Sequence, residues 1–270
     1  MDIALVIVFA AFGTALGSFL NVCIDRLPVG KSILHPPSHC DSCQHRLSPG
    51  DLIPLFSYLW LRRRCRYCGA SIPQRPFWVE LGTGLLFALS YWYFGLGVPF
   101  VVIALYGSLF LVIGIIDLEH QLILNKISYP AMVLALVIDV FRPPPGLADV
   151  SFLPWPFPGI ISGIMGAAMG LVLILVVYFL ALWIYKREGI GVGDIKLAIL
   201  MGLVTGSGMV ILAITLGAVI GGIVGIILLL TKIKKRRDPI PLGPFLTIAT
   251  MLTLVWGSDI LNWYLGLLNL

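Results

Sequence analysis

The sequence predicts an all-α polytopic membrane protein with a small polar domain inserted near its amino-terminal end. Hydrophobic residues make up 59% of the 270 residues and charged residues only 11%. Soluble domains carry roughly 25% charged residues, so that class is excluded. The apolar residues also form continuous runs of membrane-spanning length, which favours helices over a β-barrel, in which apolar and polar residues alternate.

Eight apolar segments are expected to cross the membrane, some of them short for a full span. They cover residues 3–23, 77–96, 99–116, 128–141, 159–185, 195–206, 209–231 and 245–268. The first segment follows Asp2 and no basic residue, so we expect a retained span and not a cleaved signal peptide. The chain then divides into a first span at 1–23, a polar loop at 24–76 and a helical membrane domain at 77–270.

Lysine and arginine residues lie in alternate loops, which predicts the orientation because short basic loops stay in the cytoplasm. The basic loops follow the first, third, fifth and seventh spans, and Arg142 is the only basic residue on the opposite side. We therefore expect both termini outside and the polar loop inside the cytoplasm. The net charge of +5 is explained by this topology and by contact with anionic lipid, so it does not indicate nucleic-acid binding.

Four of the five cysteines form two Cys-x-x-Cys pairs in the polar loop, namely Cys40, Cys43, Cys65 and Cys68. Two such pairs supply the tetrahedral four-sulfur shell that Zn²⁺ prefers. The alternative is a set of redox pairs or unrelated thiols, but disulfides are uncommon in the cytoplasm. A closed four-thiolate shell leaves no position for water, so we predict a structural zinc that supplies folding energy to a loop of about 50 residues.

Two aspartates adjoin apolar helices at the predicted cytoplasmic ends of their spans. Asp117 follows residues 99–116, and Asp194 ends the sequence Gly191-Val192-Gly193-Asp194. A carboxylate in such a place is costly unless it has a function. Two carboxylates brought close together cannot both ionise cheaply, so one can act as acid and the other as base toward a water that attacks a peptide carbonyl. An interfacial acid within a glycine packing motif is the alternative.

The remaining acids near the membrane receive simpler interpretations. The glycines beside Asp194 would permit an unwound or close-packed backbone at the start of the span and so let a substrate segment approach. Asp2, Asp139 and Asp259 lie near the predicted outer ends of spans, where we expect their carboxylates to reach water.

Several motifs, in order along nearly the whole chain, resemble the type IV prepilin peptidases, a family of membrane aspartyl proteases. Residues 191–196 are similar to their Gly-x-Gly-Asp signature, residues 116–123 to the segment that carries their first catalytic aspartate, and residues 17–28 to the opening motif of the bacterial members. The cysteine pairs and the segment 76–84, with Glu80, follow in the family's order. The resemblance therefore implies that Asp117 and Asp194 are the catalytic pair.

The resemblance also implies a bifunctional enzyme of the bacterial inner membrane. It would cleave the basic leader from pilin and pseudopilin precursors after a glycine, and then methylate the new amino terminus with S-adenosylmethionine. Asn21, Arg26 and Glu80 are candidate contacts for the methylation. Because the polar loop is basic, it would not attract a basic leader, so we expect Glu80, Glu119 and Glu188 to bind the leader. Lys196 could tune the aspartates' protonation or bind lipid phosphate.

Two other classes of function are compatible with acids in a membrane. A proton-coupled carrier would use them as a relay, but it predicts internal repeats with matching broken helices, and the two aspartate segments are not convincingly duplicated. A non-catalytic scaffold could hold a partner through the zinc loop. It would leave Asp117 and Asp194 without a role.

Overall fold

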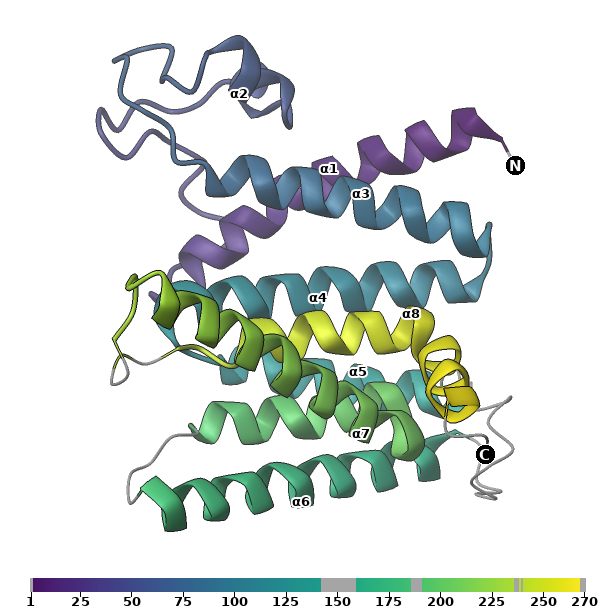
Figure 1. Cartoon of the computed structure of the whole chain (residues 1–270). Helices are drawn as coiled ribbons and strands as arrows, with labels where there is room; N and C mark the ends of the chain where they lie inside the picture. The colour runs from purple at the N-terminus through teal and green to yellow at the C-terminus, as the bar shows by residue number, and fades with distance from the viewer. Residues whose placement is uncertain (1, 142–158, 186–190, 236–237, 239, 268–270) are drawn as a thin grey trace. The chain divides into compact units, whose positions relative to one another are not determined.

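The computed structural model describes residues 2–141, 159–185, 191–235, 238 and 240–267, and their regular structure is helical (Figure 1). Within these residues the extended pairing is limited to two isolated β-bridges in the polar loop. The chain forms two compact units, Met1–Val112 and Ile113–Leu270. The predicted all-α class is confirmed.

The first unit is built on α1 (Ile3–Arg26) and α3 (Arg75–Phe94), joined by the polar loop and followed by the first part of α4 (Val98–His120). The helices α1 and α3 approach closely because α1 presents glycines to α3. A Cβ atom at Gly17 would overlap the Thr83 hydroxyl and lie 2.8 Å from the Glu80 Cα. Farther along, buried aromatic rings of α3 and α4 pack together, among them Phe87, Tyr91 and Phe100.

The polar loop contains a short 3₁₀ helix, η1 (Pro49–Leu52), and the short helix α2 (Phe56–Trp60). Most of its remaining structure consists of turns around the two cysteine pairs. The second unit contains the end of α4, then α5 (Asn125–Phe141), α6 (Ile160–Tyr185), α7 (Val192–Leu230) and α8 (Gly243–Leu267).

Helix α7 reverses direction at Gly206, where the backbone takes φ 76° and ψ 175° (Figure 1). The positive φ favours glycine, which has no Cβ to clash. The reversal is seen from Gly170 of α6, which lies beside both halves of α7. A Cβ at Gly170 would overlap the Ala198 carbonyl and lie 3.3 Å from the Val210 side chain. In a straight helix those two residues would be about 18 Å apart. The break predicted between 195–206 and 209–231 is therefore confirmed.

The first half of α7 packs backbone to backbone against α6. A Cβ at Gly166 would overlap the Gly202 carbonyl, a Cβ at Gly202 would overlap the Gly166 carbonyl, and one at Gly170 would overlap the Ala198 carbonyl. Small residues that let helix backbones touch are typical of helix pairs in membranes, where dispersion contacts replace the hydrophobic effect. These contacts fix the position of the helix that begins beside Asp194.

Five of the described helices are long and apolar enough to cross a membrane: α1, α4, α6, α7 and α8. Helices α3 and α5 occupy two further predicted spans, so the eight predicted segments correspond to seven helices with α7 counted twice. The end of α4 differs from its prediction. The helix continues beyond residue 116 to His120 and ends before Gln121, which has a positive φ of 52°.

Candidate functional site

Asp117 lies in the last turn of α4 and is buried, with 6% of its surface exposed. Its Oδ2 accepts a hydrogen bond of 3.0 Å from the backbone N–H of Gly243, the first residue of α8. The first N–H groups of a helix have no partner within that helix, and its amino-terminal end favours negative charge. Helix α8 therefore supplies a donor that holds the Asp117 carboxylate in place.

Gly243 can occupy this position because it has no side chain. A Cβ there would lie 2.5 Å from Asp117 Oδ2 and 2.8 Å from its Cγ. We did not identify Gly243 from the sequence. The run Pro241-Leu242-Gly243-Pro244 is a helix-start signal, since Pro is favoured in the first turn, but nothing in it indicates which side chain its amide will meet.

Asp194 lies in the first turn of α7, and its Oδ2 accepts a hydrogen bond of 3.0 Å from the Gly191 N–H. Gly193 packs against Ile123, in the segment that follows α4, because a Cβ at Gly193 would be 3.1 Å from the Ile123 Cβ. The predicted close packing at this glycine is therefore observed, and its partner is a residue of the same chain. The contact brings the segment after Asp117 beside the segment that carries Asp194.

Asp117 and Asp194 lie near each other within the second unit, since the Asp194 carboxylate is within electrostatic range of the Asp117 carboxylate. Each accepts a hydrogen bond from a backbone N–H at or just before the start of a helix, Asp117 from Gly243 of α8 and Asp194 from Gly191 before α7. The arrangement can hold one proton between two carboxyl groups, which is the chemical requirement for an acid and a base in one site.

The polar loop brings its four cysteines together. The sulfurs of Cys40, Cys43, Cys65 and Cys68 all lie within 4.8 Å of one another, and Cys40 Sγ is 3.9 Å from Cys68 Sγ. Zn–S bonds of about 2.3 Å in a tetrahedron place sulfurs roughly 3.8 Å apart. All four are free thiols, since none forms a disulfide. The cluster therefore fits a single tetrahedral metal ion.

The two cysteine pairs sit on turns of the same construction. The Cys40 N–H donates to the His45 carbonyl and the Gln44 N–H to the Cys40 carbonyl, while Leu47 N–H reaches the Ser38 carbonyl. The second turn repeats these bonds at the same offsets, from Cys65 to Ala70, from Gly69 to Cys65 and from Ile72 to Arg63. The residue after the second cysteine of each pair has positive φ, 59° at Gln44 and 72° at Gly69. Each turn presents two sulfurs on one side.

Backbone amides and neighbouring sulfurs set the ionisation of these thiols in opposite directions. The N–H groups of Cys43 and Ser42 lower the pKa of the Cys40 thiol to about 7. The Ala70 N–H lowers the pKa of Cys68, but burial and the other three sulfurs outweigh it and raise that pKa to about 12. Four sulfurs this close cannot all ionise without a cation between them, so the cluster is chemically suited to a metal.

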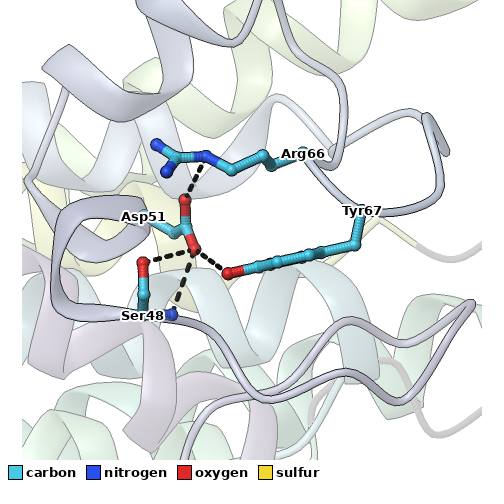
Figure 2. A network of polar contacts seen from close by, with 4 residues as sticks. All are labelled: Ser48, Asp51, Arg66 and Tyr67. Atoms are coloured by element: carbon cyan, nitrogen blue, oxygen red, sulfur yellow. Dashed lines mark hydrogen bonds and ion pairs between the residues drawn. The ribbon is translucent and has the colours of Figure 1, made fainter.

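A network around Asp51 joins the second cysteine turn to η1 (Figure 2). Asp51 Oδ2 accepts hydrogen bonds from the Ser48 N–H at 3.0 Å, the Ser48 hydroxyl at 2.7 Å and the Tyr67 hydroxyl at 3.1 Å. Its Oδ1 pairs with Arg66 Nε at 3.0 Å. Ser48 chiefly, with help from Tyr67 and Arg66, holds the pKa of the Asp51 carboxyl below its usual range. Arg66 and Tyr67 stand between Cys65 and Cys68, so the network fixes that turn.

Three predicted contact residues of the first unit are engaged within the fold. The buried Asn21 amide donates to the Gly17 and Pro76 carbonyls, each at 3.2 Å, and so braces α1 against the start of α3. Arg26 Nη1 donates to the Ser32 carbonyl at 3.0 Å. Glu80 is buried and its Oε2 accepts from the Leu55 N–H at 2.8 Å, which ties the polar loop to α3. Their roles toward S-adenosylmethionine or a leader stay predictions.

The other predicted contact residues lie in the second unit. Lys196 Nζ donates to Asn125 Oδ1 at 2.6 Å and lies 5.8 Å from the centre of the Tyr129 ring, so it connects the starts of α7 and α5. Glu119 is exposed in the last turn of α4, two residues beyond Asp117. Glu188 lies outside the described residues.

The expectation that Asp139 reaches water is wrong. Only 3% of its surface is exposed, and within the described part of the chain neither its Oδ2 nor the Ser162 hydroxyl has a hydrogen-bond partner. The reason is close packing of α5 on α6, because a Cβ at Gly163 would overlap Asp139 Oδ2. A side chain can snorkel only if its helix face is open to the interface, and this face is covered.

Comparison with known proteins gives a consistent result along the chain. Residues 11–94 match the bacterial peptidase A24 N-terminal domain, and residues 103–226 match the type IV leader peptidase family. Among the relatives is a protein of Stutzerimonas stutzeri named prepilin leader peptidase/N-methyltransferase, 32% identical over 97% of this chain and 94% of its own length. A protein of the same name from Xanthomonas campestris is 34% identical over 95% of this chain and 93% of its own length. Another from Bacillus subtilis is 30% identical over 94% of this chain and 95% of its own length. No solved structure matches.

Proposed function

The chain belongs to the type IV leader peptidase family, and we propose that it is a bifunctional prepilin leader peptidase and N-methyltransferase of the bacterial inner membrane. The observation that supports the peptidase assignment is that Asp117 and Asp194, at two helix ends, lie within electrostatic range of each other. A carrier or a scaffold would not require this pair, and the relatives' names favour neither.

In the proposed cleavage, Asp117 and Asp194 share one proton. The ionised carboxylate takes a proton from a water whose oxygen attacks the carbonyl carbon of the scissile peptide bond, and the protonated carboxyl donates its proton to the carbonyl oxygen. Return of a proton to the amide nitrogen then breaks the C–N bond. The products are the leader, ending in a new carboxylate, and the mature pilin with a free amino terminus.

Helix α8 would contribute by orienting the pair. The Gly243 amide fixes Oδ2 of Asp117, so the other oxygen of that carboxyl is left for water or substrate. A carboxylate fixed before substrate arrives needs no reorganisation during the reaction, which is how preorganised sites lower a barrier. The contact between Gly193 and Ile123 would likewise fix, before substrate arrives, the spacing between the segment after Asp117 and the segment that carries Asp194.

The second activity would transfer a methyl group from S-adenosylmethionine to the amine that cleavage releases. The donor supplies an activated methyl on a sulfonium, and the amine must lose a proton to attack it. Asn21 and Arg26, which we predicted as contacts, are both engaged in holding α1 and the turn after it. We therefore propose that they shape the donor site through the backbone that they position.

Zn²⁺ is the metal that we propose for the four-cysteine cluster, in a structural role. Residues 24–76 would then form a zinc-stabilised domain in the cytoplasm, with both termini of the chain outside and the peptidase in residues 77–270. This orientation places Asp117, Asp194 and the loop on the side where a prepilin leader is found. Glu80 would support the loop, and Glu119, Glu188 and Lys196 would border the path of the leader.

The test is mass spectrometry of a leader-bearing prepilin incubated with the purified protein in detergent, with and without S-adenosylmethionine. Wild-type protein should remove the leader and, with the methyl donor, add the mass of one methyl group. Asp117→Asn and Asp194→Asn should each lose cleavage by a factor of about 10² to 10⁴. Both variants should still methylate a pilin supplied without its leader, because the methyl transfer does not use these carboxyls.

Two results would overturn parts of the proposal. Retention of cleavage in either aspartate variant would remove that residue from the catalytic pair. A folded, zinc-loaded wild type that neither cleaves nor methylates several prepilins and pseudopilins would favour the scaffold. Asp259→Asn, on the exposed surface of α8, is the matched control and should cleave as wild type does.

A further inference from the structure

The short helix α2 is held beside the first turns of α3. Leu55, just before α2, donates its N–H to Glu80 of α3 at 2.8 Å. Tyr58 of α2 stacks on Phe77 of α3 with ring centroids 5.1 Å apart. Figure 1 agrees, since α2 lies over the amino-terminal part of α3. Glu80 is five residues into α3, so α2 is tied about 7.5 Å along that helix from its start.

The position of α2 along α3 corresponds to the membrane interface. Helix α3 corresponds to the second predicted span, and it begins at Arg75. The polar headgroup region adds several ångströms on each side of a hydrocarbon core of about 30 Å. A segment tied to the second turn of a spanning helix therefore lies at the boundary between headgroups and acyl chains.

The outer side of α2 is strongly apolar. Phe56, Leu59 and Trp60 are 74%, 62% and 86% exposed, although each is a large hydrophobic residue. A contiguous group of exposed apolar residues is typical of a surface that binds a membrane or another protein. Tryptophan in particular is enriched where a membrane meets water.

Basic residues follow this apolar group directly. Arg62, Arg63 and Arg64 are exposed, and positive φ values of 50° and 62° at Arg62 and Arg63 turn the chain sharply after α2. The Arg63 guanidinium lies 2.8 Å from the Gln74 side-chain amide, at the residue just before α3 begins. The arginines therefore lie near the start of α3.

We propose that α2 inserts into the interface of the cytoplasmic leaflet, with Phe56, Leu59 and Trp60 at the acyl boundary and Arg62 to Arg64 on anionic phospholipid headgroups. Apolar and aromatic groups beside basic ones are what an interfacial helix requires. The apolar helix of a prepilin is the other occupant to consider. Its basic leader would be repelled by three arginines, so the charge favours lipid.

The consequence is that the zinc-binding loop, besides its two ends, is attached to α3 through Glu80 and to the membrane surface through α2. This placement does not depend on which residues cleave the prepilin. It does depend on the proposed orientation, since anionic lipid and basic loops belong to the cytoplasmic side.

Photo-crosslinking of the full-length protein tests the proposal. A benzophenone amino acid replaces Trp60 in one variant and Asp41, an exposed residue of the first cysteine turn, in the control. Both proteins are placed in vesicles of phosphatidylethanolamine and phosphatidylglycerol, with zinc content checked first. Mass spectrometry should find a phospholipid adduct at position 60 and none at position 41.

The absence of a lipid adduct at position 60 would overturn the proposal, and so would an adduct with an added leader-bearing prepilin in its place. Arg62→Gln combined with Arg64→Gln should lower the yield of lipid adduct, as should replacement of phosphatidylglycerol by phosphatidylcholine. Arg46→Gln, in the first cysteine turn, is the matched control. An unchanged yield in the double variant would remove the arginines from the interaction. Cleavage assays on the same samples report separately on the peptidase.

Discussion

The cysteine cluster and the aspartate pair are assembled over very different distances along the chain. Each cysteine turn closes within ten residues, by hydrogen bonds such as those from Leu47 to Ser38 and from Cys40 to His45. The aspartate pair needs the ends of three helices, and Gly243, which holds Asp117, stands 126 residues beyond it. A substitution that disrupts the cysteine cluster should therefore lie near it in the sequence. The aspartate pair can also be disrupted by a substitution far from it in the sequence.

The largest effect is expected for Cys65→Ser, which removes one ligand of the cluster. Metal binding in small zinc domains supplies about 10 to 16 kcal/mol of folding free energy. The variant should lose its bound zinc and become sensitive to protease in the loop, while helix content by circular dichroism is retained. Cys23→Ala, in α1 and outside the cluster, should keep one zinc per chain. Full zinc occupancy in Cys65→Ser would show that three thiols suffice.

The next effect concerns Gly243→Ala, which adds one methyl group at a residue remote in sequence from both aspartates. The new Cβ would lie 2.5 Å from Asp117 Oδ2, so the carboxyl must move. A displacement of about 1 Å in a catalytic group can cost a factor of 10² in rate. We expect kcat for prepilin cleavage to fall by about that factor with zinc retained.

The matched control for this change lies in the same helix. A Cβ at Gly266 would meet no atom within 4 Å, so Gly266→Ala should cleave prepilin at the wild-type rate. If Gly243→Ala were equally active, the α8 amide would have no part in positioning Asp117.

A smaller effect is expected for Asp51→Asn, which weakens the network that holds the second cysteine turn. The pKa of Asp51 is lowered in the folded protein. The Asp51 carboxylate therefore stabilises the fold fully above the pKa of an unfolded Asp, which is about 4, and this stabilisation is lost as the pH falls through the folded pKa. At pH 7 the substitution should cost about 1.5 to 3 kcal/mol. Zinc release to a chelator should be faster by roughly a factor of ten or more. Asp41→Asn should release zinc as wild type does.

The smallest effect is expected for Asp139→Asn. Its Oδ2 has no hydrogen-bond partner among the described residues, and a buried charge is costly, so removing the ability to ionise should not destabilise the helices. We expect Tm to stay the same or rise by a few degrees. A fall of several degrees would indicate that the carboxylate has a partner that an amide cannot replace.

The sequence predicted what depends on composition and on nearby residues. Apolar runs gave the helices, the separation of the segments 195–206 and 209–231 predicted the break in α7, and the Cys-x-x-Cys spacing gave the cluster. The expectation that Asp117 and Asp194 lie on one side of the membrane stays a prediction. Contacts between distant helices were not predictable, because an apolar helix in lipid carries little periodic signal about which face meets a neighbour. The Gly243 contact and the burial of Asp139 are both of this kind.

The glycine contacts between α6 and α7 have a mechanical consequence. The backbones of these helices touch at Gly166, Gly202 and Gly170, with no side chains between them to act as a compliant layer. The helix that begins beside Asp194 is therefore part of a stiff pair. Asp117 stands on a different helix and is held there by the Gly243 N–H of α8. When a substrate enters, Asp194 should therefore keep its position, because the helix that carries it cannot shift without its partner.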